Sequence, residues 1–309
     1  MAFNSGHRDC INCGEDNSED MFSFTRKFLN EVRGQSLEKL TAAGIGENFS
    51  TTIVKCKECG CDYIKDVANY REILMSNLDW NDDKLNNSLA TYQSGFSRQQ
   101  INHITYTQSV ITNLIELVLK KKKSNSELSL LDFGCSLSLY SPLARVMGVS
   151  KVTAFDPHFP RNISKLTSSS SVVDFKFISD RNEVIANAPY DAIICNSADE
   201  HFFDLQGEIK FMNDLLADDG VAYFSHPILD LDANIHHLKN EANIKDKKLL
   251  SLLRASFYAN HLNYVKPKMF KEILKKNGFK EFRIRRIKKR NLDVSFFHRS
   301  NLLLYLKSY

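Results

Sequence analysis

The stretch LLDFGCSLSLYSPLARVMGVSKVTAFDP, residues 130–157, decides the fold of this chain. It contains an apolar strand, a turn that opens at Gly134, a helical segment and a second strand that ends at Asp156. A strand, a glycine turn and a helix in this order form the unit that cradles a nucleotide at the carboxyl end of a parallel sheet. Such a loop normally has several glycines, whereas here Ser136 and Ser138 follow Gly134. The stretch therefore predicts a nucleotide-binding unit with a modified loop.

From residue 128 to the end of the chain, the sequence alternates between strand patterns and helix patterns. This alternation predicts an α/β domain with a doubly wound, Rossmann-like parallel sheet, whose ligands gather at the carboxyl ends of the strands. The last two candidate strands have the pattern of an antiparallel hairpin at one edge. The seven candidate strands are LSLLDF, KVTAFD, DFKFIS, YDAIICN, GVAYFSH, FRIRRI and SNLLLYL.

The composition is that of an ordinary globular protein. Of the 309 residues, 43% are hydrophobic and 25% are charged, which argues against a disordered or fibrous chain. The net charge of +4 is too small to imply nucleic-acid binding by itself. No apolar run approaches the roughly 18 residues that span a bilayer, and the first residues, MAFNSGHRDC, lack the basic and apolar regions of a signal peptide. We therefore expect a soluble, cytoplasmic protein.

Four of the seven cysteines form two matching knuckles, CINCG and CKECG. In each, two cysteines three positions apart precede a glycine, which can supply the backbone conformation of a tight turn. Cys10, Cys13, Cys56 and Cys59 would offer four thiolates, the tetrahedral set that Zn²⁺ prefers in a closed structural site. A redox CxxC pair is the alternative, but it needs a βαβ setting that neither knuckle has. The pattern therefore predicts a zinc ribbon with reduced thiols.

Three regions are expected from these patterns. Residues 1–66 form the zinc-ribbon module, in which the segment DMFSFTRKFLNEVRG between the knuckles has the pattern of an inserted amphipathic helix. Residues 67–125 form a helical connector, and residues 126–309 form the Rossmann-like domain. Tyr92 and Tyr106 lie in the connector, where they could close over a ligand as a lid or pack in the core.

The chain, with its two cysteine knuckles followed by the strand and loop motifs of the α/β domain, resembles the class I S-adenosylmethionine-dependent methyltransferases. More narrowly, it resembles the bacterial members with an amino-terminal zinc ribbon. Many of those members act in sugar-nucleotide and surface-polysaccharide pathways. The resemblance implies a class I methyltransferase fold, S-adenosylmethionine as the cofactor and methyl transfer as the reaction. It spans nearly the whole chain and rests on CINCG, CKECG, LLDFGC, VTAFD, YDAIICNSADEHFFD, LLADDGVAYFSHP and HLNYVKPKMFKEILKKNGFK.

The resemblance implies roles for the residues of the glycine loop. Gly134 would let the backbone approach the amino-acid part of the cofactor, and Asp132 would fix the loop or the cofactor's amino group. The family usually reads Asp-x-Gly-x-Gly-x-Gly, and here Ser136 and Ser138 replace the second and third glycines. Serine is small and its hydroxyl can donate to a carboxylate, so the loop keeps its function if neither position needs a positive φ. If they do, the unfavourable backbone conformation of each serine costs about 1 to 2 kcal/mol and weakens cofactor binding. The other alternative is a loop that keeps the fold but has lost cofactor binding.

Three more polar residues follow later strands of the predicted sheet. By the resemblance, Asp156 after the second strand would accept both ribose hydroxyl protons, since a carboxylate suits a vicinal diol. Asp180 after the third strand would receive the adenine amino group. Asn196, with the adjoining SADEH, would lie where the methyl donor and the substrate meet. Turn formation after a strand is the structural alternative for both acids.

Four residues near the predicted site are candidates for catalysis. Methyl transfer is an in-line displacement at a sulfonium, so a base is useful when the nucleophile is a hydroxyl. The candidates are Glu200 and His201 in SADEHFF, His226 in YFSHP and His261 in NHLNY. Histidine suits this role because its pKa lies near neutrality. Each histidine could also be a packing or helix-cap residue, and a phosphate or carboxylate acceptor would need no base.

The acceptor is expected to be a small anionic molecule. The segment KEFRIRRIKKR holds seven basic residues and one acid. It could bind a phosphorylated or nucleotide-linked acceptor through arginine forks, or it could protect an edge strand by charge. The leading hypothesis is an O-methyltransferase that acts on a sugar nucleotide or glycan precursor. The alternatives are an RNA methyltransferase, for which the ribbon and the basic tail would be useful, and a non-catalytic scaffold.

Overall fold

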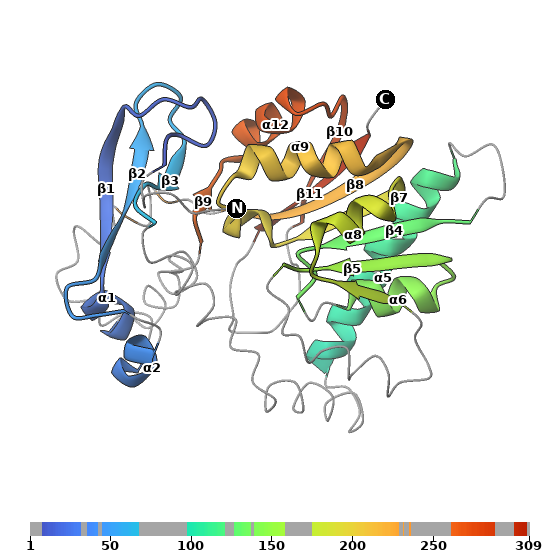
Figure 1. Ribbon diagram of the computed structural model, residues 1–309, viewed down its shortest axis with the longest axis horizontal. Coiled ribbons are helices and arrows are strands. Elements are labelled where there is room, and N and C mark those ends of the chain that lie inside the picture. The colour runs from blue at the N-terminus through green and yellow to red at the C-terminus, as the bar shows by residue number, and fades with distance from the viewer. Residues whose placement is uncertain are drawn as a thin grey trace.

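Figure 1 shows the computed structural model, in which an amino-terminal module lies beside an α/β domain. The predictions for Tyr92 and Ser138 lie outside the part of the chain that the structure describes. The side chain of the candidate base His226 also lies outside it, although the His226 backbone belongs to a strand. The described residues are 8–31, 36–42, 45–67, 98–120, 127–136, 139–157, 175–228, 231, 235, 261–287 and 300–307.

A seven-stranded sheet forms the centre of the α/β domain, in the order β10-β11-β8-β7-β4-β5-β6. Its strands are β4 (Ser129–Phe133), β5 (Lys151–Phe155), β6 (Lys176–Ile178), β7 (Tyr190–Asn196), β8 (Leu216–Ile228), β10 (Glu281–Ile287) and β11 (Ser300–Lys307). Five neighbouring strands, β6, β5, β4, β7 and β8, pair in parallel, whereas β11 is antiparallel to both β8 and β10. The Rossmann-like α/β fold with a parallel sheet is therefore confirmed.

Helices cover both faces of this sheet, because alternate side chains of each strand point to opposite faces. Leu130 and Ile194 face α5 and α6, whereas their neighbours Leu131 and Ile193 face α8, α9 and α12. The helices are α5 (Arg98–Leu119), α6 (Tyr140–Val146), α8 (Arg181–Ala186), α9 (Leu205–Leu215) and α12 (Pro267–Lys276). Every helix among the described residues is too short or too polar to cross a membrane.

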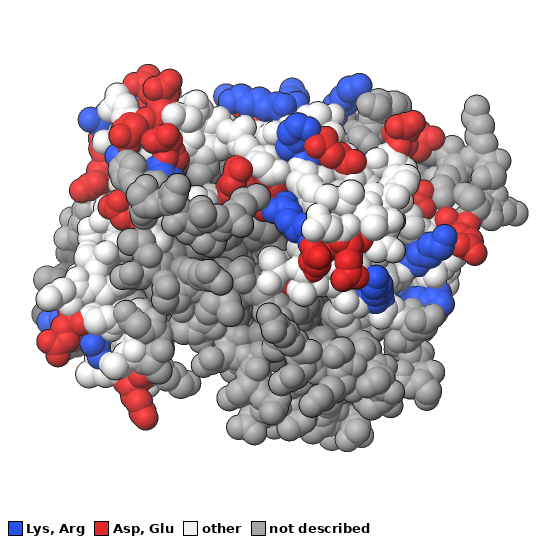
Figure 2. Space-filling view, in the orientation of Figure 1, with Lys and Arg blue, Asp and Glu red and all other residues white. Residues whose placement is uncertain are grey.

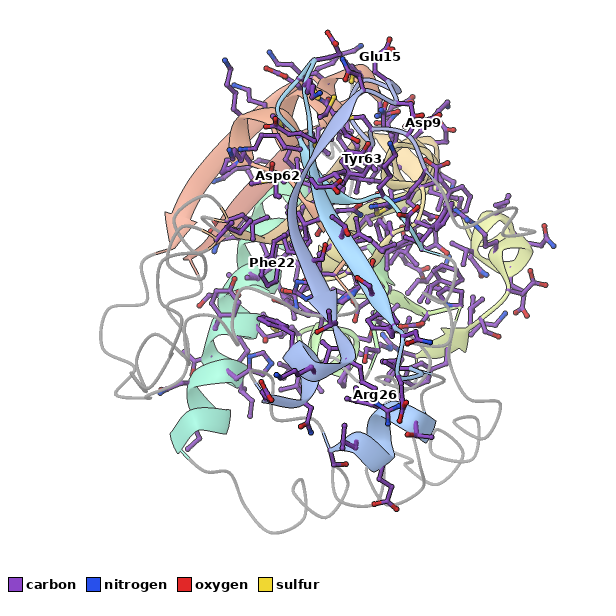
Figure 3. All side chains as sticks on the ribbon, turned by 90° about the vertical axis from the view of Figure 1, so that its left-hand side faces the viewer. Asp9, Glu15, Phe22, Arg26, Asp62 and Tyr63 are labelled. Carbon is purple, nitrogen blue, oxygen red and sulfur yellow. The ribbon has the colours of Figure 1, made fainter. Side chains whose placement is uncertain are left out.

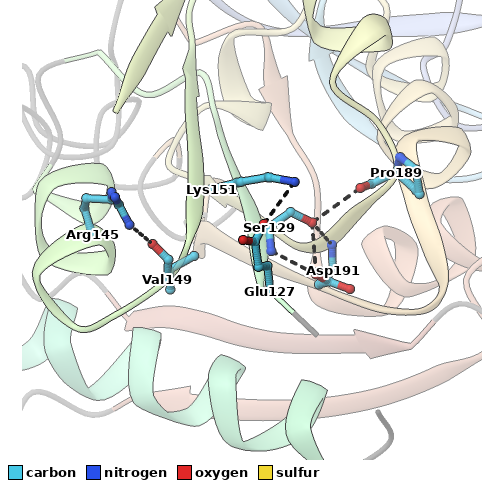
Figure 4. A network of polar contacts seen from close by, with 7 residues as sticks. All are labelled: Glu127, Ser129, Arg145, Val149, Lys151, Pro189 and Asp191. Atoms are coloured by element: carbon cyan, nitrogen blue, oxygen red, sulfur yellow. Dashed lines mark hydrogen bonds and ion pairs between the residues drawn. The ribbon is translucent and has the colours of Figure 1, made fainter. Parts of the chain in front are cut away.

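Hydrogen bonds close the amino-terminal edge of the central strands (Figure 4). The Ser129 amide and hydroxyl both donate to Asp191 Oδ2, at 2.8 and 3.0 Å, and the Asp191 amide donates back to the Ser129 hydroxyl at 3.0 Å. Lys151 pairs with Glu127 at 3.1 Å beside them. This edge joins β4, β5 and β7, and the opposite, carboxyl edge holds the glycine loop.

A second, antiparallel sheet lies at the amino-terminal end of the chain, in the order β1-β2-β3-β9. It contains β1 (Ser18–Thr25), β2 (Ser50–Cys56), β3 (Asp62–Ile64) and β9 (Asn263–Tyr264), with the short helices α1 (Arg26–Glu31) and α2 (Leu37–Ala42) between β1 and β2. We call this sheet and its two cysteine knuckles the cysteine module. Because β9 lies between β8 and α12 in the chain, a distant segment completes the module.

The inserted helix predicted between the knuckles begins later than expected. Residues 20–25 of the segment DMFSFTRKFLNEVRG belong to β1, and the helix starts only at Arg26. β1 pairs along its length with β2, and the Ser23 and Thr52 hydroxyls lie 2.9 Å apart across the two strands. The helical prediction for residues 20–25 was wrong because strand pairing with β2 satisfies the backbone there, and this partner is distant in sequence.

The cysteine module shares its core with the α/β domain. Cys10, Ile11 and Tyr63 belong to the same buried cluster as Phe270 and Leu274 of α12. Figure 1 shows β9 as the link between the small sheet and α12. The predicted boundaries at residues 66 and 125 stay predictions, but the packing joins the first and last of these regions.

Candidate active site

The Gly134 loop lies at the carboxyl edge of the sheet, directly after β4. Gly134 has a φ of +67°, and a Cβ built on it would lie 2.6 Å from the Cβ of Ala198. The amides of Gly134 and Cys135 both donate to the Phe155 carbonyl oxygen, at 2.8 and 3.0 Å. Neither this backbone conformation nor this space suits a side chain. Glycine at position 134 therefore lets the end of β4 meet the segment that follows β7.

Gly134→Ala is expected to destabilise the protein by about 2 to 4 kcal/mol, because overlap with Ala198 adds to the cost of a positive φ. Gly148→Ala is the matched control. Gly148 also has a positive φ, +94°, but a Cβ added to it would have no neighbouring atom within 4 Å, so its variant should lose only about 1 to 2 kcal/mol. Urea unfolding followed by circular dichroism measures both values. Equal losses would contradict the close contact at Ala198.

Two serines adopt left-handed backbone conformations at this edge, Ser136 with a φ of +46° and Ser197 with a φ of +52°. The Ser136 amide donates to Asp156 Oδ2 at 3.0 Å, and the Ser197 amide donates to the Ser225 carbonyl oxygen at 2.8 Å. A positive φ costs a non-glycine residue about 1 to 2 kcal/mol, and such strain collects at functional sites. The modified loop thus has the unfavourable backbone conformation at Ser136, and the hydrogen bond to Asp156 stabilises the loop in this conformation.

The other predicted cofactor acids already have structural contacts. Asp132 is buried, and its Oδ2 accepts a hydrogen bond of 2.9 Å from the Ser141 hydroxyl, which ties the end of β4 to α6. Asp180 is the N-cap of α8, where its Oδ1 accepts from the Asn182 amide at 2.9 Å. The capping role matches the structural alternative for Asp180. Contacts of these acids with a cofactor stay predictions.

A group of tyrosines lies next to Asn196 at the end of β7. The Tyr140 hydroxyl donates to Asn196 Oδ1 at 3.2 Å, and the Tyr106 and Tyr223 hydroxyls lie 2.8 Å apart. Burial raises the pKa of Tyr106, Tyr140 and Tyr223, so all three phenols stay neutral. Tyr106 packs against the core cluster under α5 and α6. This position corresponds to the core alternative for Tyr106.

Glu200, His201 and His261 gather beside the Gly134 loop. Glu200 and His201 belong to the one-turn helix η2 (Asp199–His201), which directly follows Ala198. His261 Nε2 lies 4.0 Å from Glu200 Oε1, and the His201 and His261 rings are 4.9 Å apart at an angle of 77°. Glu200 and His261 are buried, whereas His201 is partly exposed. His201 is therefore the member of this group that a substrate can reach most easily.

Hydrogen bonds hold the segment of His261 against η2. The Leu262 amide donates to the Glu200 carbonyl oxygen at 2.7 Å. The Asn263 side-chain nitrogen donates to the carbonyl oxygens of Asp199 and Phe202, at 2.8 Å each. The sequence did not identify Asn263, because its partners lie far away along the chain and a single buried amide has no motif of its own.

The four cysteines of the two knuckles come together in the cysteine module. The Cys10 and Cys59 sulfurs lie 3.4 Å apart, the Cys13 and Cys56 sulfurs lie 3.5 Å apart, and all four lie within 4.8 Å of one another. The glycine after each knuckle has a positive φ, as the turn requires. Zn–S bonds of about 2.3 Å separate tetrahedral sulfurs by about 3.8 Å. This donor set therefore fits a closed four-thiolate metal site.

A glycine loop that contacts an acidic residue at the carboxyl edge of a parallel sheet is typical of domains of the Rossmann-like class. A family model described as a methyltransferase domain matches residues 103–281, more than half of the chain. The chain therefore belongs to this methyltransferase family, and its α/β domain has the class I S-adenosylmethionine-dependent fold expected from the sequence. No curated protein matches the chain.

Several solved structures resemble the chain at low sequence identity. The Burkholderia thailandensis 1,6-didemethyltoxoflavin N1-methyltransferase, with S-adenosylhomocysteine bound, is 12% identical with a TM-score of 0.49, over 84% of this chain and 95% of that one. The Synechocystis magnesium protoporphyrin IX methyltransferase is 15% identical with a TM-score of 0.46, over 74% and 96%. An O-methyltransferase candidate from Nostoc punctiforme is 12% identical with a TM-score of 0.43; the match covers 66% of this chain but only 56% of that protein. The family assignment rests on the family model.

Proposed function

We propose that this protein transfers the methyl group of S-adenosylmethionine to a hydroxyl oxygen of a sugar nucleotide or surface-glycan precursor. One juxtaposition carries the proposal: Ala198, which precedes η2, lies against Gly134. The loop that would hold the cofactor and the group of Glu200, His201 and His261 therefore share one edge of the sheet. Membership of the methyltransferase family supports the reaction, and an imidazole at the acceptor side supports a hydroxyl acceptor.

Each residue at this edge has a distinct role in the proposal. S-adenosylmethionine supplies a methyl group on a positively charged sulfur. A nucleophile in line with the sulfur–methyl bond takes the methyl group and displaces the sulfur as the leaving group. Asp156 would accept the ribose hydroxyl protons, and Asp132 keeps the loop attached to α6. His201 would take the proton of the acceptor hydroxyl. The buried Glu200 carboxylate would then stabilise the positive charge on the imidazole pair.

Exposed basic side chains on α12 offer a surface that could attract an anionic acceptor. Exposed lysines at positions 268, 275 and 276 lie on α12, which begins six residues after His261. Figure 2 shows Lys and Arg side chains along the edge of the molecule that α12 forms. Residues 281–287 of the segment KEFRIRRIKKR form β10, but their side chains, like residues 288–290, lie outside the described part of the chain. Zinc in the cysteine cluster would have a structural role, because four thiolates leave no open position.

Cofactor binding and an acceptor screen test the proposed function together. The zinc-loaded protein is titrated calorimetrically with S-adenosylhomocysteine and then supplied with radiolabelled S-adenosylmethionine and a panel of sugar nucleotides or total RNA. We expect micromolar binding and label in at least one sugar nucleotide. Label in RNA alone would show the RNA-methyltransferase alternative to be correct. No binding at millimolar ligand would leave the non-catalytic scaffold.

His201→Asn is expected to lower kcat for the sugar nucleotide by about 100-fold to 10,000-fold, because asparagine resembles histidine in shape but cannot take the proton. The affinity for S-adenosylhomocysteine should stay the same, since His201 lies on the acceptor side. Steady-state kinetics and calorimetry on the same preparation measure the two quantities. An unchanged kcat would eliminate His201 as the base.

A further inference from the structure

Arg8 is a buried guanidinium for which the proposed reaction has no use. The side chain is 7% exposed and precedes the first knuckle by two residues. Its Nε donates to the Ile64 carbonyl oxygen at 2.8 Å, and its Nη2 donates to the Leu262 carbonyl oxygen at 2.7 Å. Its Nη1 donates to the Phe203 carbonyl oxygen at 3.0 Å and to Asn263 Oδ1 at 3.2 Å. One planar fork of donors thus joins three distant segments of the chain.

Two of these segments carry the candidate catalytic histidines. Two of the acceptors directly follow His261 in the chain, and a third lies two residues after His201. Asn263 is the link between them: its side-chain oxygen accepts from Arg8, and its nitrogen donates to two carbonyl oxygens around η2. Because Arg8 uses the oxygen of this amide, the amide is oriented with its nitrogen toward η2. Arg8 therefore acts on the position of both histidines through Asn263.

The third segment belongs to the cysteine module. The Arg8 guanidinium donates to Ile64 in β3, and the Arg8 backbone amide donates to the Lys65 carbonyl oxygen at 3.1 Å. The first knuckle is attached to the α/β domain by separate bonds, from Gln206 of α9 and Lys276 of α12 to the Asn12 carbonyl oxygen, at 3.1 and 3.0 Å. The chain from Arg8 to the first knuckle is thus anchored to the end of β3 and to α9 and α12.

We propose that Arg8 is a positioning residue of the active site, whose guanidinium holds η2 and the His261 segment together and makes the cysteine module part of that site. The inference rests on the proposed function for its catalytic meaning, but its structural content is independent of any acceptor. A metal bound by the four cysteines would hold the first knuckle, and the knuckle directly follows the chain segment of Arg8. Such a metal would therefore support the positions of the two histidines without contacting the substrate.

Arg8→Ala and Arg26→Ala form a matched pair of variants that tests this proposal. Both remove an arginine of the cysteine module, but the Arg26 bonds to Leu37 and Thr41 stay inside the module. Figure 3 shows Arg26 at the far end of the small sheet from Tyr63, beside which Arg8 lies. Hydrogen–deuterium exchange of the full-length, zinc-loaded protein should rise by about tenfold at residues 199–203 and 261–264 in the Arg8 variant and stay unchanged there in the Arg26 variant.

A second readout follows the histidines themselves. In ¹⁵N-histidine spectra, assigned with single His201 and His261 substitutions, both imidazole signals should move in Arg8→Ala and remain in place in Arg26→Ala. Unchanged exchange and unchanged imidazole signals in a folded Arg8→Ala protein would overturn the proposal.

If Arg8→Ala does not fold, Asn263→Asp replaces it. This variant keeps an oxygen for Arg8 but removes the donor toward η2, so the same two segments should exchange faster; unchanged exchange would overturn the proposal as well. Calorimetry with S-adenosylhomocysteine separates the two ideas. Failure of the wild-type protein to bind it contradicts the proposed function, whereas the exchange comparison judges Arg8 alone.

Discussion

Asp156→Ala is expected to weaken the binding of S-adenosylhomocysteine by about 100-fold or more. In the proposed complex the Asp156 carboxylate accepts both ribose hydroxyls, and each charge-assisted bond of this kind is worth about 1.5 to 3 kcal/mol. The structure adds a second contribution, because Asp156 Oδ2 also accepts from the Ser136 amide at 3.0 Å. The alanine variant would therefore lose both the acceptor for the ribose hydroxyls and the hydrogen bond that stabilises the strained loop at Ser136.

Two further variants separate these contributions in the same calorimetric titration. Asp156→Asn retains an oxygen for the Ser136 amide but lacks the charge, so its affinity should fall by only about tenfold. Asp214→Ala removes an exposed acid of α9 that pairs with Lys210 at 2.6 Å, and it should leave the affinity unchanged. Binding by Asp156→Ala as tight as that of the wild-type protein would show that the acid after β5 does not hold the ribose.

Cys13→Ser is expected to weaken metal binding by about 100-fold or more, and with it the stability of the cysteine module. Serine cannot provide the soft thiolate that zinc prefers, and a three-thiolate site is left open to water. Cys13 is exposed, so the substitution disturbs little of the core packing. The loss of stability can then be assigned to the metal. We expect one zinc per wild-type chain and less than one in the variant after dialysis, measured by elemental analysis.

Cys61→Ala is the matched control for this experiment. Cys61 is fully buried beside the second knuckle but does not belong to the four-sulfur cluster. Its variant should lose some stability through packing while it retains one zinc per chain. Cobalt substitution gives an independent test, since four thiolates produce intense sulfur-to-cobalt charge-transfer absorption. A full zinc complement in Cys13→Ser would show that Cys13 is not a ligand.

The serines of the glycine loop illustrate how far sequence reasoning reaches. The sequence identified Ser136 as a departure from the family pattern and stated the condition for its cost, a positive φ. The structure shows that condition to hold, with a φ of +46°. Ser197, with a φ of +52°, follows β7 without any sequence signal, because the strain comes from the contact of this segment with β8. A backbone conformation set by a neighbouring strand cannot be read from local residues.

The sequence by itself determined the parts of this protein that depend on local patterns. Apolar runs bounded by turns predicted the buried strands of the α/β domain, and apolar residues three and four apart predicted its helices. The spacing of CINCG and CKECG identified the four sulfurs that meet. Such patterns repeat within a few residues, and burial of one face is enough to give them their structure. The family resemblance likewise depended on short motifs in a fixed order, and the family model agrees with it.

Only the tertiary structure decided which distant segments meet. It turned residues 20–25 from a predicted helix into β1, completed the small sheet with β9, and brought His261 to Glu200. It also buried Arg8 among acceptors that follow both histidines. The physical reason is common to all of these: each contact joins groups far apart in the chain, and its free energy exists only after the whole core has closed around it.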